Sequence, residues 1–168
     1  MSDDNRAVGR IVRSAPFQGV LAAARIALGA VFFYAGAVKI VDPAGFALAV
    51  YNYHILPGWL VNVTAVMLPW VEVFAGASLV LGLWAPGGAL ILSGLLPVFT
   101  IALGFNLSRG LDIACGCFSS SLAGERITWW YLLRDSSLLL VSLLILFADQ
   151  GRFSLHSLLR RDGSHQRG

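Results

Sequence analysis

The sequence predicts an all-α integral membrane protein built as a bundle of four helices, and three observations support this fold class. Of the 168 residues, 57% are hydrophobic and only 12% are charged, whereas a soluble domain of this size needs a more strongly charged surface. Four apolar segments are each about 20 residues long, enough to cross a bilayer. Arginines collect before the first segment and after the last, which is typical of cytoplasmic ends. We therefore expect lipid contact and no nucleic-acid partner.

The chain divides into one membrane domain with a polar stretch at each end. Residues 1–16 are expected to form a disordered cytoplasmic leader, residues 17–148 the four-helix transmembrane domain, and residues 149–168 a basic cytoplasmic tail. The first apolar run, 19–41, is too long for the hydrophobic core of a signal peptide. It should therefore remain as a membrane span.

The first span carries two cations on a face that also carries glycines. With 3.6 residues per turn, Arg25, Gly29, Gly36 and Lys39 lie on the same side of the helix. Glycines allow a second helix to approach closely. We therefore expect this face to point into the bundle, with Arg25 paired.

A connection over residues 42–64 follows the Asp42-Pro43 helix break. Phe46, Val50 and Tyr53 can form the apolar face of a short helix lying in the membrane interface. His54 is expected to join the interfacial aromatic residues, because no second His or Cys stands at metal-ligand spacing nearby. No metal site is predicted here.

The remaining spans are expected over residues 65–84, 88–107 and 129–147, and each carries polar side chains. With both chain ends in the cytoplasm, the loops 42–64 and 108–128 face the outside. The second of these loops contains Cys115 and Cys117, which places both cysteines where a disulfide can persist.

A rise of 1.5 Å per residue places several polar side chains in the outer half of the bundle, below the cysteine loop. They are Lys39, Glu72, Asn106, Arg134 and Asp135. The expected ion pairs are Glu72 with Lys39 or Arg134, and Asp135 with Arg25 or Arg134. Ionisable residues inside a membrane commonly mark a functional site, although buried ion pairs can also serve only to fix helix register.

The Cys115-Gly116-Cys117 element can close a short, strained disulfide that exchanges readily. Two other roles remain open for the pair. It can clip the loop, although a ring this short removes little chain entropy. It can also hold a soft ion such as Cu(I), because two thiolates are too few for a closed zinc site.

Several motifs together resemble the MauE family within the DoxX-like membrane proteins. They are Arg25-Ile-x-Leu-Gly29, Tyr34-x-Gly-x-x-Lys39, Pro69-Trp-x-Glu72, Asn106, Cys115-Gly-Cys-Phe118, Trp129-Trp130 and Arg134-Asp135. The resemblance implies a four-helix protein of the bacterial inner (plasma) membrane. It also implies a part in methylamine metabolism, in maturing a disulfide-rich dehydrogenase subunit beside a thioredoxin-like protein.

The function predicted from residues and resemblance together is thiol–disulfide exchange with a periplasmic thioredoxin-like partner. Cys115 and Cys117 are the expected catalytic residues, with Arg25, Lys39, Glu72, Asn106, Arg134 and Asp135 as a supporting polar cluster. The single pair acts either as a relay or in a quinone-coupled device, so a quinone is the candidate cofactor. The alternative is a small transporter or binding protein for a soft metal or sulfur species.

Overall fold

The computed structural model describes residues 14–109 and 129–149, and these residues form helices. In chain order the helices are α2 (Ala15–Val41), α3 (Pro43–Asn52), α4 (Gly58–Leu81), α5 (Ala85–Ser108) and α6 (Trp129–Ala148). Among the described residues, α2, α4, α5 and α6 are long and apolar enough to cross a membrane. The predicted fold class, an all-α membrane bundle, is confirmed.

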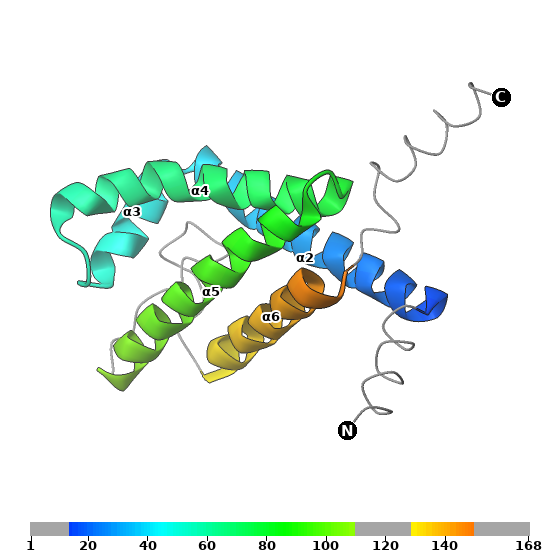
Figure 1. The fold of residues 1–168 in the computed structure, drawn as a ribbon. Helices are drawn as coiled ribbons and strands as arrows, with labels where there is room; N and C mark the ends of the chain where they lie inside the picture. The colour runs from blue at the N-terminus through cyan, green and yellow to red at the C-terminus, as the bar shows by residue number, and fades with distance from the viewer. Residues whose placement is uncertain (1–13, 110–128, 150–168) are drawn as a thin grey trace.

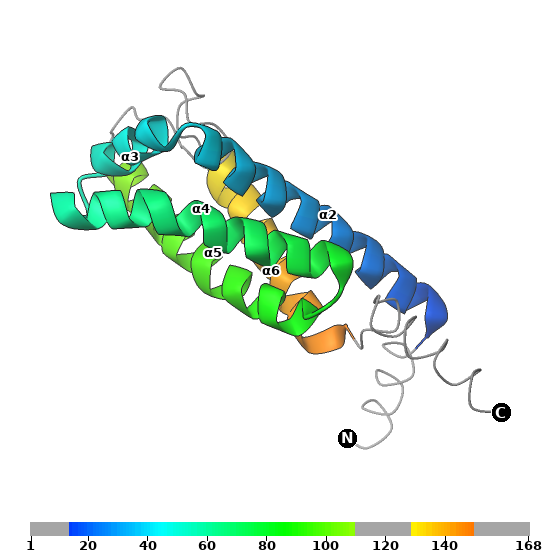
Figure 2. The same ribbon diagram turned by 90° about the horizontal axis from the view of Figure 1, so that it is seen from above.

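The four long helices run along the bundle, and the short helix α3 lies at one end of it (Figures 1 and 2). α2 packs mainly against α4, α5 packs mainly against α6, and α3 packs against α4. A central core joins the two pairs through Leu28, Leu79, Leu92 and Ile145, all at most 2% exposed.

The spans at the start of the chain are longer than the sequence pattern predicted. α2 begins at Ala15 rather than Gly19, with Ser14 as its N-cap residue and a proline in its first turn. α4 begins at Gly58 rather than Ala65, directly after Pro57. Residues 58–64 are apolar enough to continue the second span toward the N-terminus. The connection between the first two spans is therefore shorter than expected.

Asp42 joins the first span to the predicted interfacial helix. It is the C-cap residue of α2 and the N-cap residue of α3, and its side chain accepts a hydrogen bond of 2.9 Å from the backbone N–H of Gly45. α3 buries Phe46 and Ala49 against the bundle, whereas His54 beyond it is exposed. The predicted short helix is therefore confirmed, with Phe46 on its buried face and Tyr53 as its C-cap residue. That it lies in the membrane interface stays a prediction.

The glycines of α2 lie against the backbone of α4, as the sequence predicted. A methyl group added to Gly29 would lie 2.7 Å from the carbonyl oxygen of Gly76, and one added to Gly36 would lie 2.6 Å from that of Pro69. Close contact of this kind depends on the absence of side chains. It fixes the register of α2 on α4.

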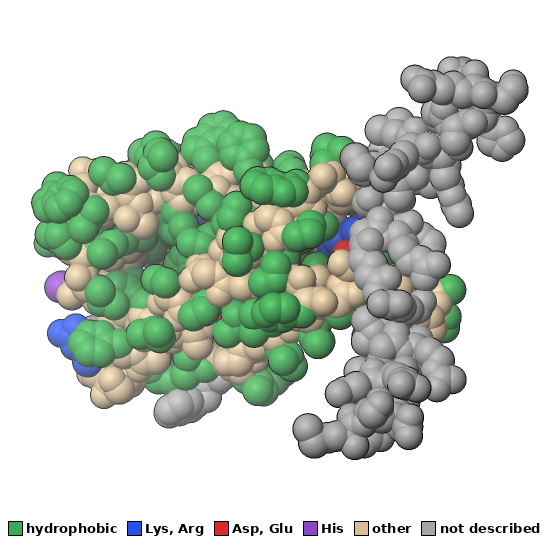
Figure 3. Space-filling view, viewed as in Figure 1, with side chains coloured by type: hydrophobic (Ala, Val, Ile, Leu, Met, Phe, Trp, Pro, Cys, Tyr) green, Lys and Arg blue, Asp and Glu red, His purple; other side chains and the backbone are tan. Residues whose placement is uncertain are grey.

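The outer surface of the helices is strongly apolar. Figure 3 shows one face, on which hydrophobic side chains predominate. Phe74, Ile101, Leu133 and Phe147 are each more than 60% exposed. A large continuous apolar surface of this kind is compatible with lipid as the surrounding solvent.

The first and last spans meet at one end of the bundle. Gln18 Nε2 donates a hydrogen bond of 3.0 Å to the carbonyl oxygen of Ala148, and Arg25 pairs with Asp149. The start of α2 and the end of α6 therefore lie together, as an even number of spans requires. That this end faces the cytoplasm stays a prediction. Nearly all of the predicted leader and tail lie outside the described residues.

Candidate functional site

A buried ion pair joins α2 to α4 near the end of the bundle that carries α3. Lys39 Nζ donates to both carboxylate oxygens of Glu72, at 2.8 and 2.7 Å, and the two side chains are each 2% exposed. The pair lies next to the contact between Gly36 and Pro69, where the two backbones are closest. The helix register set by the glycines thus brings the two charges together.

Two aromatic rings surround the Lys39 ammonium. Its nitrogen lies 5.1 Å from the ring centre of Phe46 and 5.8 Å from that of Phe99. Rings at this distance attract a cation through their electron-rich faces. The ammonium is therefore stabilised by helices α3 and α5 as well as by its carboxylate partner on α4.

A second acidic group, Asp135 of α6, lines the same space as the Lys39–Glu72 pair. Arg134 holds this carboxylate, with Nη2 3.0 Å and Nε 3.2 Å from Oδ1, and the Arg134 guanidinium also lies 4.8 Å from the ring centre of Tyr131. The carboxylate is 5% exposed and the guanidinium side chain 27%. The charges on α6 are thus anchored at the edge of the bundle and face inward.

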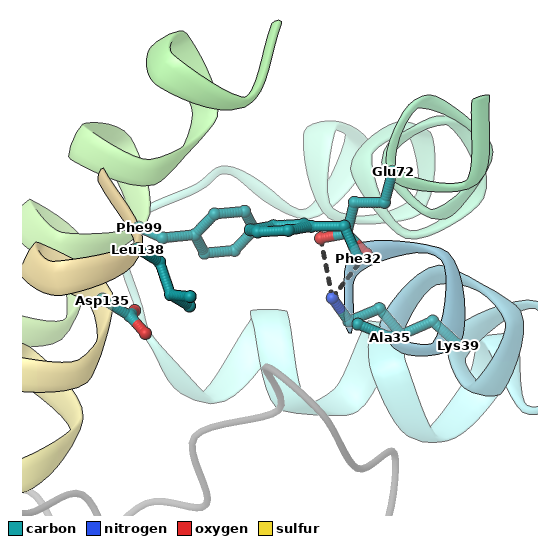
Figure 4. Close-up of a pocket in the computed structure, with 7 residues that line it drawn as sticks. All are labelled: Phe32, Ala35, Lys39, Glu72, Phe99, Asp135 and Leu138. Carbon is teal, nitrogen blue, oxygen red and sulfur yellow. Dashed lines mark hydrogen bonds and ion pairs between the residues drawn. The ribbon is translucent and has the colours of Figure 1, made fainter. Parts of the chain in front are cut away.

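Lys39, Glu72 and Asp135 line a small cavity together with Phe32 and Phe99. Figure 4 shows Asp135 on the opposite side of this space from the ion pair, with the two rings alongside. We call this space the charged chamber. Its volume is about 20 Å³, room for one water molecule. The cavity thus brings titratable side chains from α2, α4 and α6 around a space of this size.

Two of the ion pairs considered from the sequence are formed, and a third cation has a different partner. The pairs Lys39–Glu72 and Arg134–Asp135 are confirmed. Arg25 instead pairs with Asp149, at 2.9 Å, so of the two cations considered for Asp135 the structure selects Arg134, and the Arg25 option is wrong. Lys39 lies 14 positions after Arg25, which corresponds to about 21 Å of helix and places Arg25 at the opposite end of the bundle.

Asn106 lies near the end of α5 and is completely buried. Its Nδ2 donates a hydrogen bond of 2.9 Å to the carbonyl oxygen of Ala102, whereas its Oδ1 has no hydrogen-bond partner among the described residues. An unsatisfied buried acceptor costs about 1–3 kcal/mol. The amide thus retains an acceptor that a hydroxyl or water could use.

Tyr53 follows α3 at the same end of the bundle. It packs against Leu103 together with Leu107, Tyr131 and Leu132. Burial, and secondarily the negative charge of Asp135, raise the pKa of Tyr53 above its ordinary value. Its hydroxyl therefore stays protonated and remains a hydrogen-bond donor.

Cys115 and Cys117 lie outside the described residues, so their predicted role stays a prediction. The described residues on either side of their segment are Arg109, the C-cap residue of α5, and Trp129, the first residue of α6. Both flank the end of the bundle that holds Tyr53 and the charged chamber, because Leu107 and Tyr131 belong to the cluster around Leu103.

The sequence pattern missed some of the residues that complete these contacts. Phe46 was expected on an interfacial helix but not against Lys39, and Phe99 and Asp149 were not singled out. Asp149 carried a usable signal: it is the first acidic residue after the last apolar segment, and it stands near the same membrane boundary as Arg25. Phe99 carried none, because an aromatic residue in a membrane span is ordinary.

The fold and these charges define a class, a four-span helical membrane protein with ionic contacts buried among its spans. The family model described as "Methylamine utilisation protein MauE" matches residues 18–148. The chain belongs to the MauE family.

Curated relatives agree with this assignment. The chain is 35% identical over 127 residues to the methylamine utilization protein MauE of Paracoccus denitrificans, a match that covers 75% of this chain and 68% of the relative. It is 35% identical over 92 residues to that of Methylorubrum extorquens, covering 54% and 49%, and 33% identical over 101 residues to that of Methylophilus methylotrophus, covering 60% and 53%. The last two matches span about half of the relatives' length. No solved structure matches the chain.

Proposed function

We propose that this chain is a thiol–disulfide exchange protein of the bacterial inner membrane, acting through Cys115 and Cys117 on a periplasmic thioredoxin-like partner. The names of its relatives indicate the setting of methylamine utilisation. In that setting the exchange would serve the maturation of a protein that acquires disulfides.

The observation that supports this proposal most directly is the position of the charged chamber. Lys39, Glu72 and Asp135 lie at the end of the bundle from which the cysteine segment departs, between Arg109 and Trp129. Ionisable side chains buried inside a membrane are costly and commonly mark a functional site. Their position at the end of the bundle to which the segment with Cys115 and Cys117 is joined is therefore the reason to connect them with thiol chemistry.

The proposed exchange moves two electrons between two pairs of sulfurs. A thiolate of the reduced partner attacks the Cys115–Cys117 disulfide, forms a mixed disulfide and releases the other cysteine as a thiolate. The second thiolate of the partner then attacks the mixed disulfide. The partner leaves oxidised, and this chain is left with two reduced cysteines.

Renewed turnover requires an oxidant, and we propose a quinone of the membrane for this step. One quinone takes two electrons and two protons from the two thiols, which restores the disulfide and yields one quinol. The carboxylates of Glu72 and Asp135 are the proposed acceptors for protons released beside the sulfurs, through the water that the charged chamber can hold.

Trapping the mixed disulfide tests the exchange. The variants Cys115→Ser and Cys117→Ser are each expressed in cells, and membranes are separated by electrophoresis with and without reductant. In one variant the remaining thiolate should attack the disulfide of the oxidised thioredoxin-fold partner, the reverse of the second step, and accumulate a reductant-sensitive adduct. The double variant should give none. Absence of an adduct from both single variants, each present at the normal level in membranes, would overturn the proposal.

A second experiment separates a functional charged chamber from one that only fixes helix packing. Glu72→Gln and Asp135→Asn keep nearly the same shape while removing a proton acceptor. If the chamber serves the exchange, these variants should slow reoxidation of the cysteine pair in membranes by at least about tenfold, within the range of general acid–base effects. Unchanged reoxidation in folded variants would assign the charges to packing alone.

A further inference from the structure

A second cavity lies beside the charged chamber, between α3, α4 and α5. Its volume is about 280 Å³, and its walls are apolar except for the side chains of Tyr53 and Thr64. An apolar cavity of about 150 Å³ is enough to hold benzene. This larger cavity therefore has room for a substituted single ring or for two fused rings.

The mouth of this cavity faces the lipid side of the bundle. Ile55, Leu56 and Val98 line the cavity and are 45%, 36% and 64% exposed, respectively. A molecule dissolved in the bilayer can therefore enter without crossing water. This access favours a ligand carried by the membrane over a water-soluble one.

The inner wall of the cavity is shared with the charged chamber. Phe99 lines both spaces, and Phe46 lines the larger cavity while it also packs over the Lys39 ammonium. A ring bound in the cavity would thus be separated from Lys39, Glu72 and Asp135 by only one layer of aromatic side chain. The aromatic rings of Phe46 and Phe99 also provide surfaces suited to stacking against a planar ligand.

Polar groups at the outer end of the cavity suit a ligand with oxygen atoms. Tyr53 contributes a phenolic hydroxyl to the cavity lining, a group that can donate a hydrogen bond. Thr64 also lines the cavity, and its hydroxyl can donate or accept a hydrogen bond. A carbonyl oxygen needs a donor and a hydroxyl group needs an acceptor. A quinone and its quinol present these two groups in turn, whereas a lipid acyl chain presents neither.

We infer that this cavity between α3, α4 and α5 binds the head group of a membrane quinone, with the Tyr53 hydroxyl donating to a quinone carbonyl. The inference rests on the proposed function in one respect, since that function calls for a quinone as electron acceptor. It goes beyond it by assigning the acceptor to a defined site. The site consists only of described residues and does not include the cysteines.

Binding can therefore be tested without thiol chemistry. The full chain carrying both Cys115→Ser and Cys117→Ser is purified in detergent and titrated with a short-chain benzoquinone or naphthoquinone, with quenching of tryptophan fluorescence as the readout. Saturable binding of one equivalent is expected, and the two probes distinguish between the common head groups. Displacement of the probe by phospholipid as readily as by quinone would show that the cavity holds lipid chains, and the inference would be wrong.

Three variants locate the site. Ala102→Leu fills the cavity and Val98→Trp narrows its mouth; both should weaken quinone binding at least about tenfold, because steric overlap excludes the ring. Tyr53→Phe removes one hydrogen bond and should weaken it by up to about tenfold. Ala44→Leu, on the exposed side of α3, is the matched control and should bind as the parent does.

The outcomes separate this inference from the proposed function. If the cysteine-free chain binds no quinone, or if Val98→Trp and Tyr53→Phe bind it unchanged, the site is wrong even when a mixed disulfide is trapped. Val98 is exposed, so its replacement should not prevent folding if Ala102→Leu does. If quinone binds as expected but no mixed disulfide forms, the proposed thiol–disulfide exchange is wrong and the quinone site is supported.

Discussion

Each end of the bundle contains a buried cation from α2, and the two ends use it differently. Arg25 pairs with Asp149, one residue beyond the end of α6, with the two side chains 1% and 6% exposed. Lys39 pairs with Glu72 inside α4, with both side chains 2% exposed. The first contact closes a helix terminus, whereas the second lies among cavities and aromatic rings.

The surroundings of the two pairs explain this difference. Next to Arg25, Gln18 donates to the backbone carbonyl of Ala148, one of the last-turn carbonyls that a helix cannot satisfy by itself. The contacts at this end of the bundle therefore hold the first span against the last. At the other end, Asp135, Phe46 and Phe99 gather around Lys39, and Asn106 keeps an acceptor without a partner among the described residues. Similar ionic contacts thus stand in different surroundings, and we propose a role in the exchange only for the one in the charged chamber.

The largest expected effect comes from breaking the Lys39–Glu72 pair. Lys39→Met leaves the Glu72 carboxylate buried without its cation and should lower the free energy of unfolding by about 3–5 kcal/mol. The double variant Lys39→Met/Glu72→Met removes both charges and should recover most of that loss. Unfolding in mixed micelles with increasing dodecyl sulfate measures both. A double variant no more stable than the single one would show that the pair is not the interaction lost.

Breaking the Arg25–Asp149 contact between α2 and α6 should lower the stability by a smaller amount. Asp149→Asn removes a charge-assisted hydrogen bond and should lower the free energy of unfolding by about 1.5–3 kcal/mol. Reoxidation of the cysteine pair should proceed at the parental rate in this variant, in contrast with Glu72→Gln. A slowed reoxidation in Asp149→Asn would remove the distinction between the two ends.

A substitution at the glycine contact between α2 and α4 should also affect the two ion pairs differently. Gly76→Ala places a methyl group 2.6 Å from the carbonyl oxygen of Gly29 and should cost about 1–3 kcal/mol. Because it separates α2 from α4, it should weaken the Lys39–Glu72 pair and leave Arg25–Asp149, between α2 and α6, intact. Double-mutant cycles with each pair measure this. Gly94→Ala is the control, since no atom lies within 4 Å of the added methyl.

The smallest expected effect concerns Tyr53. Since burial and Asp135 raise its pKa in the folded protein, its contribution to stability is present below the pKa of the unfolded chain, about 10, and is lost as the pH rises above that value. At about pH 11, Tyr53→Phe should leave the tyrosinate absorbance of the folded protein unchanged. In the unfolded chain the same substitution should reduce it. A reduction in the folded protein would show that Tyr53 is not shielded.

Much of the fold follows from patterns within single helices. The apolar lengths gave the four spans, and the spacing of Gly29, Gly36 and Lys39 gave the packed face of α2, because both depend only on helix geometry. The pairing of Lys39 with Glu72 was one of two options, decided by the glycine contact between the helices. The start of α4 was misplaced because the interfacial residues before Ala65 are compatible with either a loop or a helix.

The candidate site depended more on contacts between helices. The larger cavity forms where α3, α4 and α5 meet, and no spacing along the chain indicates an empty volume between helices. Phe99 acquires its importance only by lying between that cavity and Lys39. Asp149 escaped prediction because its partner, Arg25, stands 124 residues earlier in the chain.

The contact between Gly29 and Gly76 has a mechanical consequence. No side chain separates the two backbones at this contact. Sliding of α2 along α4 would bring main-chain atoms into collision, so the two helices are expected to move as one rigid unit. A relative movement of the long helices would therefore have to occur between the α2–α4 pair and the α5–α6 pair, the pair to which the cysteine segment is joined.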